Sequence, residues 1–273
     1  MTDGATRVGS RWLALREPAD AAARAPDLVD HLEGEMLASG RGVIHDLGCG
    51  TGAMGRWLAP LLPGRQHWIA HDRDVGLLAI APAHPPGSAA DGSAVTLETV
   101  HSDITRLRAD DLSGATLITA SALLDMLTQD ELVGLAAVCV TARCPILLTL
   151  SVVGRVSITP ADPLDLAVSA AFDAHQRRTT HRGRLLGPDA AGFIAEEFAR
   201  LGAEVQVRPS PWRLGPSHAD LLRTWFTGWV GAACEQQAEL TAETDGYTRE
   251  RLAQAKAGEL GVSVGHADVL VLP

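Results

Sequence analysis

Residues 43–62 constrain the fold of this 273-residue chain more than any other segment. A short apolar run there ends in glycines at three alternate positions, Gly48, Gly50 and Gly52, and an amphipathic stretch follows at once. This order predicts a strand, a glycine turn and a helix. Glycine is needed where a turn takes positive φ or where a ligand touches the backbone, and a helix N-terminus presents unpaired N–H groups. The segment therefore indicates that a ligand binds at the turn.

Strand and helix patterns alternate through the first half of the chain. A helical pattern comes first, at residues 11–39, and Pro18 and Pro26 should divide it into pieces. We expect strands at 42–47, 67–71, 95–100, 116–120 and 145–151, with helices at 53–62, 76–81 and 128–143 between them. Such alternation predicts right-handed crossovers and a parallel sheet covered by helices.

Helical patterns dominate after Ser151. We expect helices at 164–176, 190–201, 218–238 and 247–259, a strand at 203–208 and a final strand at 268–272. No internal repeat and no low-complexity linker divides the sequence, so a single α/β domain with helical additions is expected.

Composition narrows the class of protein. Hydrophobic residues make up 46% of the chain, which is enough for a sizeable core, and the net charge of −10 argues against broad contact with nucleic acid. No apolar run reaches the roughly 18 residues of a membrane span, and the N-terminus lacks the apolar core of a signal peptide. The cysteines have neither CxxC nor zinc spacing, so we expect no metal site and a reduced, cytoplasmic setting. They are Cys49, Cys139, Cys144 and Cys234.

Two classes of ligand use a turn of this kind. The string Gly50-x-Gly52-x-x-Gly55 matches the GxGxxG pattern of dinucleotide-binding turns, which would make the protein an NAD-dependent oxidoreductase. In those proteins the strand runs straight into its first glycine. Here the first glycine after the strand is Gly48, and Asp46 precedes it. The oxidoreductase therefore stays an alternative.

The segment Asp46-x-Gly48-x-Gly50-x-Gly52 resembles motif I of the class I S-adenosylmethionine-dependent methyltransferases. The resemblance covers residues 40–151 well and the rest of the chain in outline. It implies S-adenosyl-L-methionine as the cofactor and S-adenosyl-L-homocysteine as its product. In that family the loop passes beside the methionine and ribose portions of the cofactor, so no pyrophosphate has to be held.

The resemblance also implies an architecture. We expect a Rossmann-like three-layer α/β/α sandwich, with a seven-stranded, mostly parallel sheet whose last strand is antiparallel. Residues 268–272 would supply that strand beside 203–208. The single domain, 1–273, would comprise an N-terminal helical lid at 1–40, a cofactor-binding core at 41–151 and a substrate-side half at 152–273, with a helical insertion at about 216–260.

Acidic residues at successive strand ends fit the same family. Asp72 is about 20 residues beyond the central glycines, where an acid can reach the ribose hydroxyls, and Asp74 is its rival unless it caps the next helix. The resemblance puts Asp103 at the adenine amino group, with Ile104 against the ring and Arg73 along it. An ordinary strand-end turn is the alternative for Asp103. The residues expected at the cofactor are Asp46, Gly48, Cys49, Gly50, Gly52, Asp72, Arg73, Ser102, Asp103, Ile104 and Ser121.

The acceptor side is less defined. Methyl transfer from a sulfonium depends mostly on positioning, because the leaving group departs neutral, so no catalytic triad is needed. Asp125, after the fourth strand, is a candidate base or orienting group, or simply a residue at the start of a helix. The segment 119–125 lacks the Asn-Pro-Pro-Tyr motif and the paired cysteines of other methyltransferases. Insertions in the second half would shape a pocket, which favours a small-molecule acceptor methylated on O, N or C.

Residues 175–184 form the densest basic cluster in this acidic chain. They are either a solvated loop, a site for a carboxylate or phosphate on an anionic acceptor, or an RNA contact, which makes an RNA methyltransferase another alternative. His175 and His181 are further candidate bases. Trp225 and Trp229 share one helical face and either pack on the sheet or form an aromatic wall over the acceptor. The residues expected at the acceptor are Arg16, Arg178, Arg182 and Trp225.

Overall fold

The computed structural model describes residues 9–34 and 41–273. Its strands are β1 (Arg41–Leu47), β2 (Arg65–Asp72), β3 (Val95–His101), β4 (Leu117–Ser121), β5 (Ile146–Thr159), β8 (Glu204–Pro209), β9 (Trp212–Leu214) and β10 (Gly261–Leu272), together with the two short strands β6 (Thr179–Thr180) and β7 (Gly183–Arg184). The helices are α1 (Ser10–Ala23), α3 (Ala53–Leu58), α4 (Val75–Leu78), α5 (Gln129–Thr141), α6 (Leu164–Gln176), α7 (Ala190–Arg200), α8 (Ala219–Gln236) and α9 (Thr241–Ala257).

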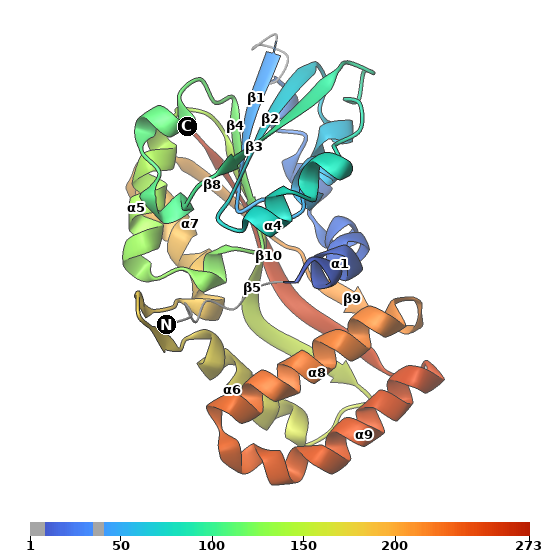
Figure 1. Cartoon of the computed structure of the whole chain (residues 1–273). Helices are drawn as coiled ribbons and strands as arrows, with labels where there is room; N and C mark the ends of the chain where they lie inside the picture. The colour runs from blue at the N-terminus through green and yellow to red at the C-terminus, as the bar shows by residue number, and fades with distance from the viewer. Residues whose placement is uncertain (1–8, 35–40) are drawn as a thin grey trace.

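One sheet organises these elements, in the order β3-β2-β1-β4-β5-β10-β8, with β9 also paired to β10 (Figure 1). The strands β1 to β5 pair in parallel, whereas β10 is antiparallel to both β5 and β8. The expected α/β fold, its mostly parallel sheet and its antiparallel last strand are confirmed. The sheet has eight strands rather than seven, because the three residues of β9 add to the edge of β10 beyond the end of β8.

Hydrophobic side chains fill both faces of the sheet. On one face Ile44, Leu58 and Trp68 belong to a buried cluster beneath α3. On the other, Leu132 and Phe198 pack from α5 and α7 in a second buried cluster. The start of α5 is fixed by a capping box: the Thr128 hydroxyl accepts the N–H of Glu131 at 3.3 Å, and the Glu131 carboxylate accepts the N–H of Thr128 at 2.9 Å. The sheet, with helices packed on both of its faces, forms a three-layer sandwich.

Strands β5 and β10 continue past the sheet as a two-stranded antiparallel arm, against which α6, α8 and α9 gather (Figure 1). The sequence pattern predicted much shorter strands, 145–151 and 268–272. The pattern of alternation breaks because Leu150 has φ 56° and β10 shifts register between Val264 and His266. The arm carries a separate apolar cluster that includes Trp229, Tyr247 and Val262.

The N-terminal region differs from the sequence prediction in one respect. Helix α1 runs through Pro18, although a proline inside a helix removes a hydrogen bond and costs about 3 kcal/mol. The turn around it is held by the Arg16 guanidinium, which donates to both carboxylate oxygens of Asp20 at 2.8 and 3.2 Å. The predicted lid at 1–40 includes residues 1–8 and 35–40, which lie outside the described residues. Within the described chain, no helix is long and apolar enough to cross a membrane.

Candidate active site

A cavity of about 1090 Å³ opens at the carboxyl ends of the parallel strands. Pockets that bury one drug-sized ligand measure about 300–1,000 Å³, so this cavity is large enough for two small ligands side by side. Of the residues predicted at the cofactor, all but Gly52 line it: Asp46, Gly48, Cys49, Gly50, Asp72, Arg73, Ser102, Asp103, Ile104 and Ser121. Of the residues predicted at the acceptor or as bases, Arg16, Asp125, Arg182 and Trp225 line it.

The glycine turn has the conformation that its sequence demands. Gly48, Gly50 and Gly52 have φ values of 69°, 56° and 85°, a region that other residues rarely adopt. A side chain at Gly50 would also lie 3.0 Å from Leu13 of α1. Gly52 does not face the cavity. It is the residue before α3, where its left-handed conformation turns the chain into the helix. The turn therefore brings bare backbone to the cavity wall.

Asp72 is tied directly to this turn. One of its carboxylate oxygens accepts the N–H of Gly50 at 2.8 Å, and the other accepts the N–H of Asp74 at 2.8 Å. Asp74 in turn caps α4, where its carboxylate accepts the N–H of Gly76 at 2.8 Å. The capping role considered for Asp74 is therefore present, and Asp72 is the carboxylate fixed beside the glycines.

Asp103 begins a short 3-10 helix, Ile104–Arg106, at the end of β3. Its carboxylate accepts both the N–H of Thr105 at 3.1 Å and the Thr105 hydroxyl at 2.7 Å. The strand-end turn considered for Asp103 is thus real, and the same turn holds the carboxylate and the apolar side chain of Ile104 in the cavity wall.

Asp46 and Arg24 are two buried charged residues that line the cavity on the side of the glycine turn. Burial raises the pKa of Asp46 to about 6, while a hydrogen bond from the Thr119 hydroxyl at 2.8 Å opposes the rise. Arg24 is 3% exposed, donates to the hydroxyls of Ser121 at 3.0 Å and Thr149 at 3.3 Å, and lines the cavity. Sequence reasoning missed Arg24, because nothing in its local pattern shows that α1 returns to the sheet.

The other half of the cavity is aromatic. Aromatic residues are scarce in this chain, at 4%, yet four of its six tryptophans line the cavity together with Phe172. The tryptophans are Trp12, Trp212, Trp225 and Trp229. They come from α1, β9 and α8, and Trp225 and Trp229 stack with ring centroids 5.4 Å apart and planes at 17°. These two rings are part of the apolar cluster and also line the cavity.

Arg16 is enclosed by this aromatic half and its charge is balanced there. The guanidinium carbon lies 4.9 Å from the ring centre of Trp212 and 5.9 Å from that of Trp12. The Asp20 carboxylate pairs with Arg16 and also accepts the indole N–H of Trp212 at 2.9 Å. Arg16 therefore braces α1 against β9 rather than presenting an open charge.

Asp125 lies in the short helix Leu124–Met126 that follows β4. Burial raises its pKa to about 6, and the nearby charges of Arg16 and Arg178 oppose that rise. The side-chain amide of Gln176 donates to its carboxylate at 3.5 Å. A carboxylate with this pKa can accept a proton near neutral pH.

His266 on β10 is a cavity residue that the sequence did not indicate. Its Nδ1 lies 3.0 Å from the carbonyl oxygen of Val264, and its ring packs 5.1 Å from that of Trp212. Burial, together with the positive charge of Arg16, lowers the pKa of His266 to about 3. The imidazole is therefore neutral at physiological pH.

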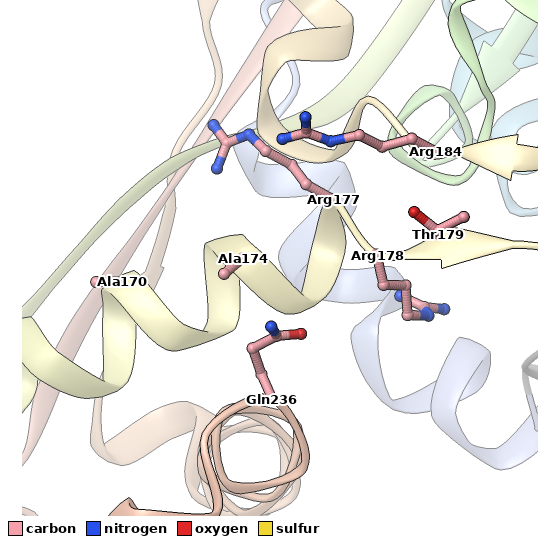
Figure 2. A pocket seen from close by; sticks show the side chains of 7 residues that line it. All are labelled: Ala170, Ala174, Arg177, Arg178, Thr179, Arg184 and Gln236. Atoms are coloured by element: carbon pink, nitrogen blue, oxygen red, sulfur yellow. The ribbon is translucent and has the colours of Figure 1, made fainter.

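The basic cluster at 175–184 is mostly separate from the cavity. Arg177 pairs with Asp189 at 2.6 Å, and His175 lies 3.3 Å from Glu235. Only Arg182 reaches the cavity, and it pairs with Glu131 at 2.8 Å. Neither His175, His181 nor Arg178 lines the cavity. Arg177, Arg178 and Arg184 instead surround a second pocket of about 600 Å³ beside α6, in which Arg178 points away from the other two (Figure 2).

Comparison with known proteins adds the fold family. No protein-family model and no curated protein matches the chain. Among solved structures, the cyclopropane synthase MmaA2 from Mycobacterium tuberculosis is similar with a TM-score of 0.51 and 14% identity, over 97% of this chain and 94% of that one. A SAM-dependent methyltransferase from Geobacter sulfurreducens, solved with S-adenosyl-L-homocysteine, has a TM-score of 0.45 and 16% identity over the full length of both chains.

The strand order and the likeness to the cyclopropane synthase define the same architecture. The chain has the fold of the class I S-adenosylmethionine-dependent methyltransferases. In this fold the glycine turn follows β1, Asp72 is the last residue of β2, and Asp103 follows β3.

Proposed function

We propose that this protein is an S-adenosyl-L-methionine-dependent methyltransferase that acts on a small molecule. The observation that carries the proposal is a single cavity with two unlike halves. One half has the bare glycine turn and the carboxylates of Asp72 and Asp103, and the other has the tryptophans. A nucleoside-like cofactor suits the first half and a second, apolar ligand suits the other.

The residues of the first half fit the cofactor. Asp72 would accept the ribose hydroxyls, Asp103 would accept the adenine amino group, and Ile104 would pack against the ring. The lack of a side chain at Gly50 lets α1 pack closely on the turn, because a Cβ there would lie 3.0 Å from Leu13. Residues 41–151 would hold the cofactor, while α1 and the segments after 152 would close over the acceptor.

The chemistry asked of the protein is limited. When bound, S-adenosyl-L-methionine supplies a methyl group on a positively charged sulfur. Asp125 lies beside the end of β4 and would hold the acceptor or take its proton, since its raised pKa of about 6 suits proton transfer near pH 7. The enclosing aromatic wall would exclude water and fix the acceptor in line, which is the main source of rate. The methylated atom would be O, N or C.

Calorimetry of the full-length protein tests this function. We expect S-adenosyl-L-homocysteine to bind with a one-to-one stoichiometry and a micromolar dissociation constant, and NAD not to bind. Binding of NAD alone would favour the oxidoreductase alternative. The sheet already argues against that alternative, because the dinucleotide-binding order 3-2-1-4-5-6 is parallel throughout, whereas here the antiparallel β10 separates β5 from β8.

An acceptor made of RNA is the other alternative. It would rest on the basic cluster at 175–184, but Arg177 and Arg182 are engaged by Asp189 and Glu131. RNA binding that depends on salt and is lost when Arg177 and Arg178 are both changed to alanine would favour this alternative over a small molecule.

A further inference from the structure

Two hydrogen-bond acceptors line the aromatic half of the cavity. The first is His266. A carbonyl oxygen can only accept, so the contact with Val264 fixes the proton of the neutral imidazole on Nδ1. The other ring nitrogen, Nε2, is left as a lone-pair acceptor. Within the described parts of the chain, no side chain or backbone group donates to it.

The second acceptor is the carboxylate of Asp125. Its hydrogen bond from the side-chain amide of Gln176 is long, at 3.5 Å, and its own backbone N–H also acts on it. Arg16, whose positive charge acts on Asp125, is paired with Asp20. The nearby guanidinium of Arg182 is taken by Glu131 and by the carbonyl oxygen of Met126. Nε2 of His266 and the ionised carboxylate of Asp125 can therefore each take a hydrogen bond from a donor on the ligand.

The walls around these two groups are flat and apolar. Trp225 and Trp229 present stacked indoles, and Phe172, Val156 and Val264 add further apolar surface. The faces of Trp12 and Trp212 are already used by the guanidinium of Arg16. Aromatic walls favour flat rings, which gain stacking energy that a saturated ring of the same size does not.

We infer that the acceptor is a planar aromatic or heteroaromatic ring that carries a hydroxyl or N–H donor, with the ring against Trp225 and the donor directed at Nε2 of His266. This inference rests on the proposed methyltransferase function and names its substrate class. A carboxylate or phosphate directed at Nε2 of His266 is disfavoured, because its oxygens would face a second lone-pair acceptor instead of a donor. The anionic acceptor considered from the basic cluster is therefore not the one this half of the cavity fits.

Three related probes test the inference on the full-length protein saturated with S-adenosyl-L-homocysteine. They are 2-naphthol, 2-methoxynaphthalene, which keeps the ring but has no donor, and trans-2-decalol, which keeps the hydroxyl but is not planar. By calorimetry we expect 2-naphthol to bind, removal of the donor to weaken binding about fivefold, and loss of planarity to weaken it by a similar factor. Equal affinities for the three probes, or no binding of 2-naphthol, would overturn the inference.

Variants then assign the donor preference to His266. His266→Leu should abolish the preference for 2-naphthol over 2-methoxynaphthalene, whereas His266→Gln, which keeps an acceptor, should retain part of it. His218→Gln, outside the cavity, is the matched control and should behave as the wild type. A preference unchanged in His266→Leu would overturn the role of His266.

Binding of S-adenosyl-L-homocysteine distinguishes a failure of the substrate class from a failure of the methyltransferase function. If it binds to the wild type and 2-naphthol does not, the substrate class is wrong and the methyltransferase proposal stands. If it does not bind, the methyltransferase proposal fails and the inference fails with it. The same titration checks that each variant is folded, and the comparison of probes on the wild type needs no variant at all.

Discussion

The two halves of the cavity are assembled in different ways. The cofactor half comes from the ends of β1, β2, β3 and β4, and its functional residues lie in the last positions of a strand or in the turn that follows. The acceptor half comes from α1, α6, α8, β9 and the β5–β10 arm, which are far apart in the sequence. The first half is a set of local motifs on one sheet edge, whereas the second exists only after the whole chain has folded.

The halves also differ in how they treat charge. In the cofactor half, the carboxylates of Asp72 and Asp103 are oriented by backbone N–H groups and remain available at the surface of the cavity. In the acceptor half, Arg16 and Arg182 are each paired with a carboxylate. The cofactor half would therefore recognise a polar ligand through fixed charges. The acceptor half would recognise an apolar ligand through the shape of its walls.

Asp268 ties the end of α1 to β5 and to the segment between β8 and β9, which support the acceptor half, and we expect the largest effect from its loss. Its buried carboxylate accepts the N–H of Ala25 after α1 and the N–H of Leu150, both at 2.8 Å, and the Ser210 hydroxyl at 2.6 Å. Asp268→Leu leaves two buried N–H groups without partners, so the free energy of unfolding should fall by about 2–5 kcal/mol in urea denaturation. Ser210→Ala removes one donor and should cost about 1 kcal/mol. Equal stability of Asp268→Leu and wild type would contradict this account of how α1 is held.

Variants in the two halves should differ in their affinity for S-adenosyl-L-homocysteine. Asp72→Ala should weaken binding by about tenfold or more, through the loss of two charge-assisted hydrogen bonds to the ribose. Because Asp72 also holds the N–H of Gly50, Asp72→Asn is the better-matched variant, and we expect a loss of similar size from it.

Trp225→Leu, in the acceptor half, is the companion variant and should change this affinity by less than about twofold, since distant sites act independently. The measurement is calorimetry at one salt concentration. If Trp225→Leu lowers the affinity as much as Asp72→Asn does, the division into two halves is wrong.

This division also explains what could be predicted from the sequence. The glycine turn, the acidic strand ends and most helix bounds follow from local patterns, and the helix expected at 164–176 has those bounds. His266, Asp268 and Arg24 carried no such signal, because their roles depend on partners far away in the chain. The bond from Ala25 to Asp268 spans 243 residues. The length of the β5–β10 arm was missed because Leu150 and the register shifts interrupt its alternation.

The pH dependence of protein stability tests whether the carboxylate of Asp125 is buried. Burial raises its pKa from 3.8 to about 6, so the folded protein binds this proton more tightly than the unfolded chain does. The stability that this group contributes is therefore greatest below about pH 4 and is lost as the pH rises through about 6.

Asp125→Asn does not titrate and should gain thermal stability relative to the wild type between about pH 4.5 and about pH 7.5. Asp245→Asn, at an exposed position on α9, is the control and should show no such trend. A melting-temperature difference between Asp125→Asn and wild type that does not change with pH would contradict the buried state of this carboxylate.

The smallest effect is expected at the second pocket. Arg177 and Asp189 form a partly exposed pair, worth about 0.2–1 kcal/mol, so Arg177→Ala should lower the free energy of unfolding by no more than about 1 kcal/mol. Affinity for S-adenosyl-L-homocysteine should be unchanged, because Arg177 does not line the large cavity. A marked loss of cofactor affinity would mean that the basic cluster belongs to the active site after all.

The most direct test of the central claim is a crystal structure of the protein with S-adenosyl-L-homocysteine. The account predicts the ribose hydroxyls on the carboxylate of Asp72, the adenine between Asp103 and Ile104, and the sulfur directed toward the side where Asp125 and the tryptophans lie. Density for the ligand in the second pocket, or in the large cavity with its adenine among the tryptophans, would contradict it.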